Sequence, residues 1–409
     1  MNNKLFDFSC LTLSLLVPFT VFSQKSNKDK PNIIVIFADD EGFADLSCYG
    51  ATQYSTPNFD LMAQQGIRFT NFYSAQAVSS ASRAGLLTGC YPNRVGITGA
   101  LFPNSEIGLN PDEEIIPELL KENAYKTAMF GKWHLGDNKD FFPTKQGFDK
   151  WIGLPYSNDM WPVNYAGEKV VNGYIPLLLY NNETVLDTID SKSKMDQLTT
   201  IYTEESVRFI QQNKKNPFFI YLAHAMPHVP LGVSEKFKGK SKQGMYGDVM
   251  MEMDWSLGEI LKALKDNKID KNTLVIFTSD NGPWINYGNH AGSTGGLREG
   301  KGTSFEGGQR VPCIMYWPGK IEGGRVSNSL ASTLDLLPTI SAITQSRLPS
   351  KQIDGLNILP IILDDENLEI RKEFYYYYNK NDLEAVRNEN FKLVFSHKHR
   401  SYENVLPKK

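Results

Sequence analysis

Residues 79–89 read SSASRAGLLTG, a small polar cluster that leads into an apolar, helix-like run with Arg83 near its front. A serine hydroxyl is a poor nucleophile unless a base or another group activates it. The formal net charge of −3 gives the chain no overall field for anions and argues against nucleic-acid binding. An anionic substrate must therefore be held by local cations such as Arg83, beside whichever serine reacts.

Four oxygen-bearing side chains follow two apolar runs: Asp39 and Asp40 after the first, Asp280 and Asn281 after the second. No cysteine or histidine pattern of the zinc type lies nearby. Each pair alone has an ordinary interpretation, a helix cap for Asp-Asp and a turn for Asp-Asn-Gly. If the pairs meet at one point, their charges repel unless a hard cation joins them, so together they predict a Ca²⁺ or Mg²⁺ site.

Further cations lie in two short motifs. Lys132 and His134 are two residues apart in GKWHLG and would share one side of an extended segment. Lys301 lies in the glycine-rich stretch LREGKGTSFEGG, which nearly matches a phosphate-binding loop. Gly302 replaces the serine or threonine of that loop and no buried strand leads directly into it, which argues against nucleotide binding.

The elements that must position these residues alternate between strands and helices, which predicts an α/β sheet covered on both faces. In such sheets ligands gather beyond the carboxyl ends of the strands, where the polar residues lie in this sequence. The expected strands are the apolar runs within 31–40, 217–228 and 272–282, and the expected helices lie within 115–124, 202–213 and 247–267.

The two ends of the chain differ in composition from the middle. Lys4, the apolar residues 11–22 and the polar Ser23-Gln24 predict a secretory signal peptide over residues 1–24, and hence a periplasmic or secreted protein. No other segment is apolar and long enough to span a membrane. Residues 373–396 alternate aromatic and polar side chains, which predicts a hairpin in a small antiparallel sheet.

The motif SSASRAGLLTGCYPNR resembles the signature of the type I sulfatases, members of the alkaline-phosphatase-like superfamily. NIIVIFADD, GKWHLG, HAMPHVP, TSDNGP and GKGTSFEGGQRVP are similar to further blocks of that family, in the family's order. The nearest members in character are arylsulfatase A-like and N-acetylgalactosamine-6-sulfatase-like enzymes. The resemblance implies a large, mostly parallel mixed sheet between helices as a catalytic domain over 25–345, and a small C-terminal α+β domain over 346–409. Family members usually continue further, so we expect the small domain to be truncated.

The resemblance implies that Ser79 is the residue that becomes formylglycine (3-oxoalanine), made in serine-type sites by a radical-S-adenosylmethionine maturase. Ser80 occupies the variable position, and Ser82-Arg83 complete the motif. Residue 79 would join Asp39, Asp40, Asp280 and Asn281 around one divalent cation, for which we expect Ca²⁺ in preference to Mg²⁺.

The same resemblance implies a covalent mechanism. A hydroxyl of hydrated formylglycine attacks sulfur while Arg83, Lys132 and Lys301 neutralise the sulfate oxygens. His228 protonates the leaving alcohol, and His134 takes a proton from the second hydroxyl to release sulfate.

The expected substrate is a sulfated glycan, which His290, Asp159 and Trp161 would contact. A packed surface turn explains Asp159 and Trp161 nearly as well, and an ordinary loop position explains His290. Two other functions stay open at this stage, a phosphomonoester or phosphonate hydrolase on the same fold and an inactive glycan-binding relative. The sequence does not fix the oligomeric state.

Overall fold

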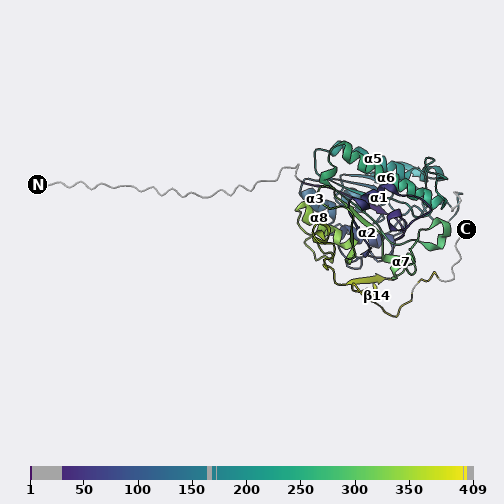
Figure 1. Ribbon diagram of the computed structural model, residues 1–409. Helices are drawn as coiled ribbons and strands as arrows, with labels where there is room; N and C mark the ends of the chain where they lie inside the picture. The colour runs from purple at the N-terminus through teal and green to yellow at the C-terminus, as the bar shows by residue number, and fades with distance from the viewer. Residues whose placement is uncertain (2–29, 164–167, 172, 399, 403–409) are drawn as a thin grey trace.

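The computed structural model describes residues 1, 30–163, 168–171, 173–398 and 400–402 (Figure 1). The predicted signal peptide, apart from Met1, lies outside the described residues. Within the described part of the chain, no helix is both long and apolar enough to cross a bilayer.

The centre of the molecule is a ten-stranded mixed sheet in the order β11-β2-β10-β9-β1-β8-β4-β5-β6-β7. Its middle is parallel: β1 (Asn32–Ala38) pairs with β8 (Phe218–Ala223) on one side and β9 (Thr273–Ser279) on the other. The three predicted strands are therefore neighbours, and their carboxyl ends meet at one edge. The remaining strands are β4 (Lys126–Gly131), β5 (Lys150–Gly153), β6 (Leu177–Asn181), β7 (Thr184–Ile189), β10 (Cys313–Tyr316), β2 (Ile67–Phe69) and β11 (Arg325–Ser327).

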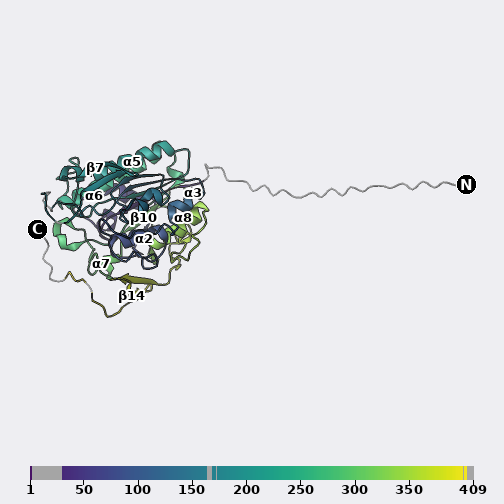
Figure 2. The ribbon, with the colours of Figure 1, turned by 180° about the vertical axis from the view of Figure 1, so that it is seen from behind.

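Helices cover both faces of the sheet, as Figures 1 and 2 show from opposite sides. Side chains of β1 alternate between two cores: Val35 packs in one with α2, α3 and α8, and Ile36 packs in the other with α1, α5 and α6. Because both faces of β1 are buried, its sequence is apolar throughout. The helices are α1 (Pro57–Gln64), α2 (Ser79–Thr88), α3 (Ile116–Glu122), α4 (Lys192–Met195), α5 (Leu198–Asn213), α6 (Met245–Asp266), α7 (Glu306–Gln309), α8 (Leu336–Thr344) and α9 (Leu359–Leu363).

A small antiparallel sheet follows near the C-terminus, drawn towards the yellow end of the colour range in Figure 1. It contains β13 (Phe374–Tyr378), β14 (Asp382–Arg387) and β15 (Lys392–Val394), and a separate two-stranded ladder joins β3 (Phe72–Tyr73) to β12 (Ala331–Ser332). The predicted hairpin is confirmed. The domain boundary at residue 345 stays a prediction.

The Glu306 carboxylate is one of the contacts that join the C-terminal sheet to the main body, and we call it the acidic hub. The Glu306 carboxylate, at the start of α7, accepts hydrogen bonds from Tyr73 Oη (2.7 Å) and Tyr376 Oη (2.9 Å). It also pairs with Arg387 (3.1 Å) and Lys392 (3.0 Å) of the small sheet. α7 follows the glycine-rich loop that carries Lys301, so the small sheet and this loop are tied together.

Candidate active site

Ser79 is the first residue of α2, whose ten residues are all buried. Its Oγ donates a hydrogen bond to Asp39 Oδ1 (3.0 Å). Val78, the residue before the helix, provides no side-chain cap, so the backbone N–H groups of the first turn have no capping acceptor from it. The start of α2 therefore combines a nucleophile-bearing side chain with backbone donors that favour an anion.

The predicted metal ligands meet because β1 and β9 end at the same level, with Ala38 opposite Ser279. The backbone N–H of Asp40 donates to Asp280 Oδ1 (3.0 Å), and Asn281 Nδ2 donates to Asp40 Oδ1 (2.7 Å). Asn281 Oδ1 is buried and has no hydrogen-bond partner among the described residues. A buried oxygen without a donor is costly, and a hard cation would satisfy it.

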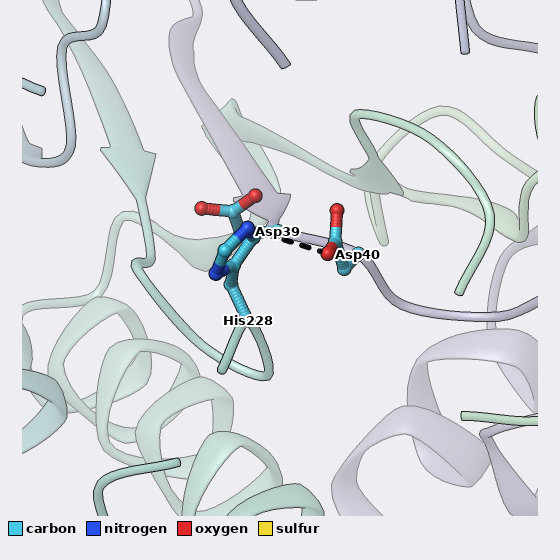
Figure 3. A group of neighbouring side chains, drawn as sticks. All are labelled: Asp39, Asp40 and His228. Carbon is cyan, nitrogen blue, oxygen red and sulfur yellow. Dashed lines mark ion pairs between the residues drawn. The ribbon is translucent and has the colours of Figure 1, made fainter. Parts of the chain in front are cut away.

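A closer group of donor atoms within this site is Asp39, Asp40 and His228, whose ligand atoms all lie within 4.8 Å of one another (Figure 3). His228 Nδ1 contacts the Val229 carbonyl oxygen (2.5 Å), and its Nε2 lies 3.5 Å from Asp40 Oδ2. Donation from Nδ1–H leaves Nε2 as the nitrogen that faces the acids. His228 could therefore bind a metal or exchange a proton with a substrate.

The predicted cations converge on the same acids. Lys132 Nζ contacts Asp39 Oδ2 (2.5 Å), and Lys301 Nζ contacts Asp40 (2.7 Å to Oδ1). All four side chains are at least nine-tenths buried.

Arg83 completes the set. Its Nη2 lies 3.0 Å from Asp280 Oδ2 and 3.5 Å from Asp39 Oδ2, and its Nη1 donates to the Lys132 carbonyl oxygen (3.0 Å). In sum, three cations face three carboxylates: Arg83, Lys132 and Lys301 against Asp39, Asp40 and Asp280.

The acids differ in how readily they ionise. Burial raises the pKa of Asp280 to about 7, and the neighbouring charge of Asp39 adds to the effect. Burial also opposes ionisation of Asp39, but Lys132, His228 and Arg83 hold its pKa well below the usual value. The protein's own cations thus keep Asp39 ionised and leave Asp280 undercompensated, which favours a further positive charge at this point.

His134 lies on the other side of Lys132, but not in the extended segment that the spacing suggested. β4 ends at Gly131, where a Cβ atom would lie 1.7 Å from the Ala223 carbonyl oxygen, and His134 has a left-handed φ of 60°. Its Nε2 contacts the Leu101 carbonyl oxygen (2.8 Å), and its Nδ1 has no partner among the described residues. Burial and then the charge of Lys132 hold its pKa well below the usual value, so the ring is neutral, with Nδ1 as the nitrogen left without a partner.

A cavity of about 460 Å³ opens over Ser79. Its wall contains His134, His228 and Lys301, together with Asp159, one of the three predicted substrate residues.

The other two predicted substrate residues are not among the residues that line this cavity. Trp161 is only 2% exposed and belongs to the same core cluster as residues of α5 and α6, and His290 is the last residue of the 3-10 helix η6 (Ile285–His290). The polar and aromatic residues after β5 drew attention to a loop that does line the cavity, but the sequence could not show which of its side chains face the cavity and which face the core.

Comparison with known proteins identifies the chain. A family model described as Sulfatase matches residues 31–346, and one described as the C-terminal part of N-sulphoglucosamine sulphohydrolase matches residues 300–405. The chain is 41% identical over 358 residues to N-acetylgalactosamine-6-sulfatase of Canis lupus familiaris, a match that covers 85% of this chain and 68% of that protein. The chain belongs to the sulfatase family.

This sulfatase is also similar to arylsulfatase A of Homo sapiens, with 37% identity over 380 residues that cover 89% of this chain and 75% of that protein. Among solved structures, PsFucS1 sulfatase from Pseudoalteromonas sp. superposes with a TM-score of 0.84 at 30% identity, over 90% of this chain and 79% of that chain. The predicted type I sulfatase family and α/β fold are confirmed, and the chain is a sulfatase enzyme.

Several residues of the sulfatase's cavity were not predicted from the sequence. Ser157 Oγ accepts a hydrogen bond from Lys132 Nζ (3.1 Å), and the Trp284 ring lies 4.7 Å from Lys301 Nζ. Trp284 directly follows TSDNGP, so a search just past the acid motif could have found it. The remaining ones come from distant segments and carry no motif: Tyr174, Tyr378, Asn379, Lys380 and Arg400.

Proposed function

We propose that this sulfatase removes sulfate from a sulfated glycan, using a formylglycine made from Ser79 and a bound divalent cation. The observation that carries the proposal is the 3.0 Å contact between Ser79 Oγ and Asp39, beside a cavity that Ser79 and Lys301 line. Arg83 and Lys132 are buried against the same Asp39 carboxylate. Nucleophile, anion-binding cations and metal-type ligands therefore surround one point.

Charge balance supports the cation. When all three carboxylates are ionised they offset the three cations of the site, so a sulfate ester monoanion gains little net attraction from these groups. Asp39, Asp40, Asp280 and Asn281, with residue 79, would hold the ion, and four oxygen side chains of this kind suit Ca²⁺. When bound, such an ion supplies Lewis-acid polarisation of an oxygen at residue 79. The ion would also offset the negative charge of the carboxylates. The N–H groups of Arg83, Lys132 and Lys301 would then be available to bind sulfate oxygens.

The chain's own residues then take separate roles. Arg83, Lys132 and Lys301 bind the sulfate oxygens and stabilise charge that develops on them. His228, held through Nδ1, gives a proton from Nε2 to the leaving alcohol. His134 is neutral and lines the cavity beside residue 79, where it accepts a proton as sulfate leaves.

Conversion of Ser79 explains why a serine suffices. Hydrated formylglycine supplies two hydroxyls on one carbon, one for attack and one for release of sulfate, whereas serine has only one. We propose that a radical-S-adenosylmethionine maturase removes two hydrogen atoms from the Ser79 side chain. This proposal goes with export to the periplasm or medium through the segment 1–24.

The residues that line the cavity support a saccharide as the substrate. Trp284, Tyr174 and Phe102 offer aromatic surface for sugar rings, and Asp159 Oδ1 is buried with no hydrogen-bond partner among the described residues. The relatives named above include an N-acetylgalactosamine-6-sulfatase. We therefore propose a terminal sulfate ester, at the 6-position of galactose or N-acetylgalactosamine.

The test is desulfation of a panel of defined sulfated saccharides by matured enzyme, with matched phosphate esters beside them. We expect sulfate release that requires a divalent cation and is fastest with 6-sulfated galactose or N-acetylgalactosamine. Faster phosphate release would favour the phosphoesterase alternative, and saccharide binding without turnover in fully converted protein would favour the inactive relative.

A further inference from the structure

One wall of the cavity comes from the C-terminal sheet and from the segment that follows it. Tyr378 ends β13, and Asn379 and Lys380 form the turn that leads to β14. Arg400 lines the same wall. These segments are about 80 residues or more beyond Lys301 along the chain, and the acidic hub at Glu306 ties the sheet that carries the turn to the active-site loop.

Two of these residues are cations that the reaction scheme does not use. Lys380 is exposed and forms no ion pair or hydrogen bond with any residue that the structure describes. Arg400 contacts Tyr402 Oη (3.4 Å) and lies 6.0 Å from the Trp284 ring, but it too has no carboxylate partner in the described part of the chain. Lys301, by contrast, is paired with Asp40.

The charge of the wall is therefore one-sided. Among the described residues of the wall, Asp159 is the single carboxylate, and Lys380 and Arg400 are the cations that no carboxylate pairs there, whereas Lys301 is offset by Asp40. The Arg400 guanidinium also approaches the backbone of the active-site loop, since a Cβ atom on Gly302 would lie 3.2 Å from its Nη1. Unpaired cations beside an anion-binding site raise the local concentration of anions and favour ligands with more than one negative charge.

From this geometry we infer that Lys380 and Arg400 select a saccharide that carries a second anionic group, a carboxylate or another sulfate, next to the sulfate ester that is cleaved. The inference rests on the proposed function and adds to it a specificity that the reacting residues do not provide. Lys380 and Arg400 act on substrate choice, whereas Arg83, Lys132 and Lys301 act on the scissile group.

The test compares three substrates with matured enzyme: N-acetylgalactosamine 6-sulfate, its 4,6-disulfate, and a disaccharide in which a uronate adjoins the 6-sulfated residue. We expect kcat/KM to be about tenfold or more higher for at least one dianionic substrate, as one charge-assisted contact provides. Preference for the 4,6-disulfate would identify the second anion as sulfate, and preference for the uronate disaccharide would identify it as carboxylate. Raising the salt concentration should shrink the preference.

Lys380→Gln and Arg400→Gln should each lower kcat/KM for the preferred dianionic substrate by about tenfold, and for the monosulfated sugar by less than about twofold. Lys214→Gln, which removes an exposed lysine outside the cavity, is the matched control. No preference in the wild type, or an equal loss with all three substrates, would overturn the inference.

A binding measurement separates this inference from the proposed function. Titration of the Ser79→Ala variant with the same saccharides needs no turnover. Tighter binding of a dianionic saccharide that Lys380→Gln and Arg400→Gln abolish would support the inference even if matured enzyme released no sulfate. Equal affinity for mono- and dianionic saccharides would defeat it, even in an active sulfatase.

Discussion

Asn281 Nδ2 donates a 2.7 Å hydrogen bond to Asp40 Oδ1. The other end of the same amide, Oδ1, is buried and receives no hydrogen bond from the described residues. One side chain thus fixes an acid from the neighbouring strand and presents a bare oxygen beside it. A cation at this point would satisfy the oxygen and offset the acids at once.

The first prediction concerns that cation. Exhaustive chelation should abolish turnover, and Ca²⁺ should restore it. Asp280→Asn keeps the volume of the side chain but removes a charge, so bound metal and kcat/KM should fall by about 100-fold while circular dichroism is unchanged. Metal content is measured by mass spectrometry. Asp266→Asn, at an exposed acid of α6, is the control, and full activity of chelated enzyme would contradict the prediction.

The second prediction concerns Ser79. Co-expression with a radical-S-adenosylmethionine maturase should yield a Ser79 peptide that lacks two hydrogen atoms and reacts with hydrazides. Sulfate release should increase in proportion to the converted fraction, and Ser79→Ala should be inactive with an unchanged fold. Protein with wholly unmodified Ser79 and full activity would refute the mechanism.

The third prediction concerns Ser80, which the motif treats as variable. Its Oγ accepts a hydrogen bond from the buried Leu101 N–H (3.0 Å), and the Leu101 carbonyl oxygen contacts His134 Nε2. Ser80→Ala leaves that N–H unpaired, so the free energy of unfolding should fall by about 1–3 kcal/mol. The position of His134 should loosen as well, and kcat per converted enzyme should fall.

Urea denaturation and turnover normalised to formylglycine content measure both effects. Ser82→Ala is the control for stability, because Ser82 Oγ is buried without a partner among the described residues and its removal breaks no hydrogen bond. A Ser80→Ala protein as stable as wild type would show that Leu101 finds another acceptor.

The fourth prediction concerns Asp254 of α6. Its carboxylate accepts hydrogen bonds from the backbone N–H groups of Asn58 (2.8 Å) and Phe59 (3.0 Å) in the first turn of α1. Burial raises its pKa from 3.8 to about 6 despite these bonds. The folded protein therefore binds the proton more tightly than the unfolded chain does. The stability that this provides is complete below pH 4 and is lost as the pH rises to about 6.

Asp254→Asn resembles the protonated acid at every pH. The difference in unfolding free energy, wild type minus variant, should therefore decrease by about 3 kcal/mol between pH 4 and pH 7. Urea denaturation of both proteins at each pH measures it, and the subtraction removes other titrating groups. A difference that stays constant with pH would show that Asp254 has an ordinary pKa.

The sequence indicated that the predicted metal ligands would lie together, because strands buried on both faces leave long apolar runs with abrupt polar ends. Asp39, Asp40, Asp280 and Asn281 follow such ends and lie together in the structure. The strand register, which brings them level, is a consequence of the same burial.

The rim of the cavity could not be predicted in this way. Lys380 reaches it through tertiary packing of the small sheet and Arg400 through the segment after β15, and no local pattern encodes either arrangement. Trp161 was predicted to contact substrate as the aromatic member of a polar-aromatic set suited to sugar, yet its side chain is buried in the core. The helix α5 begins at Leu198, before the periodic segment that marked it, because packing against α6 extends the helix beyond its strongest local pattern.

The tie between Glu306 and the small sheet has an evolutionary consequence. The side chains that we propose to react lie on α2 and in the loops that follow the central strands, whereas the turn that includes Lys380 belongs to a separate sheet that Tyr376, Arg387 and Lys392 join to Glu306. Mutations in that turn can change which saccharides are accepted at little cost to the chemistry. Enzymes that descend from one ancestor can therefore acquire different substrate ranges through changes in a few solvent-facing residues.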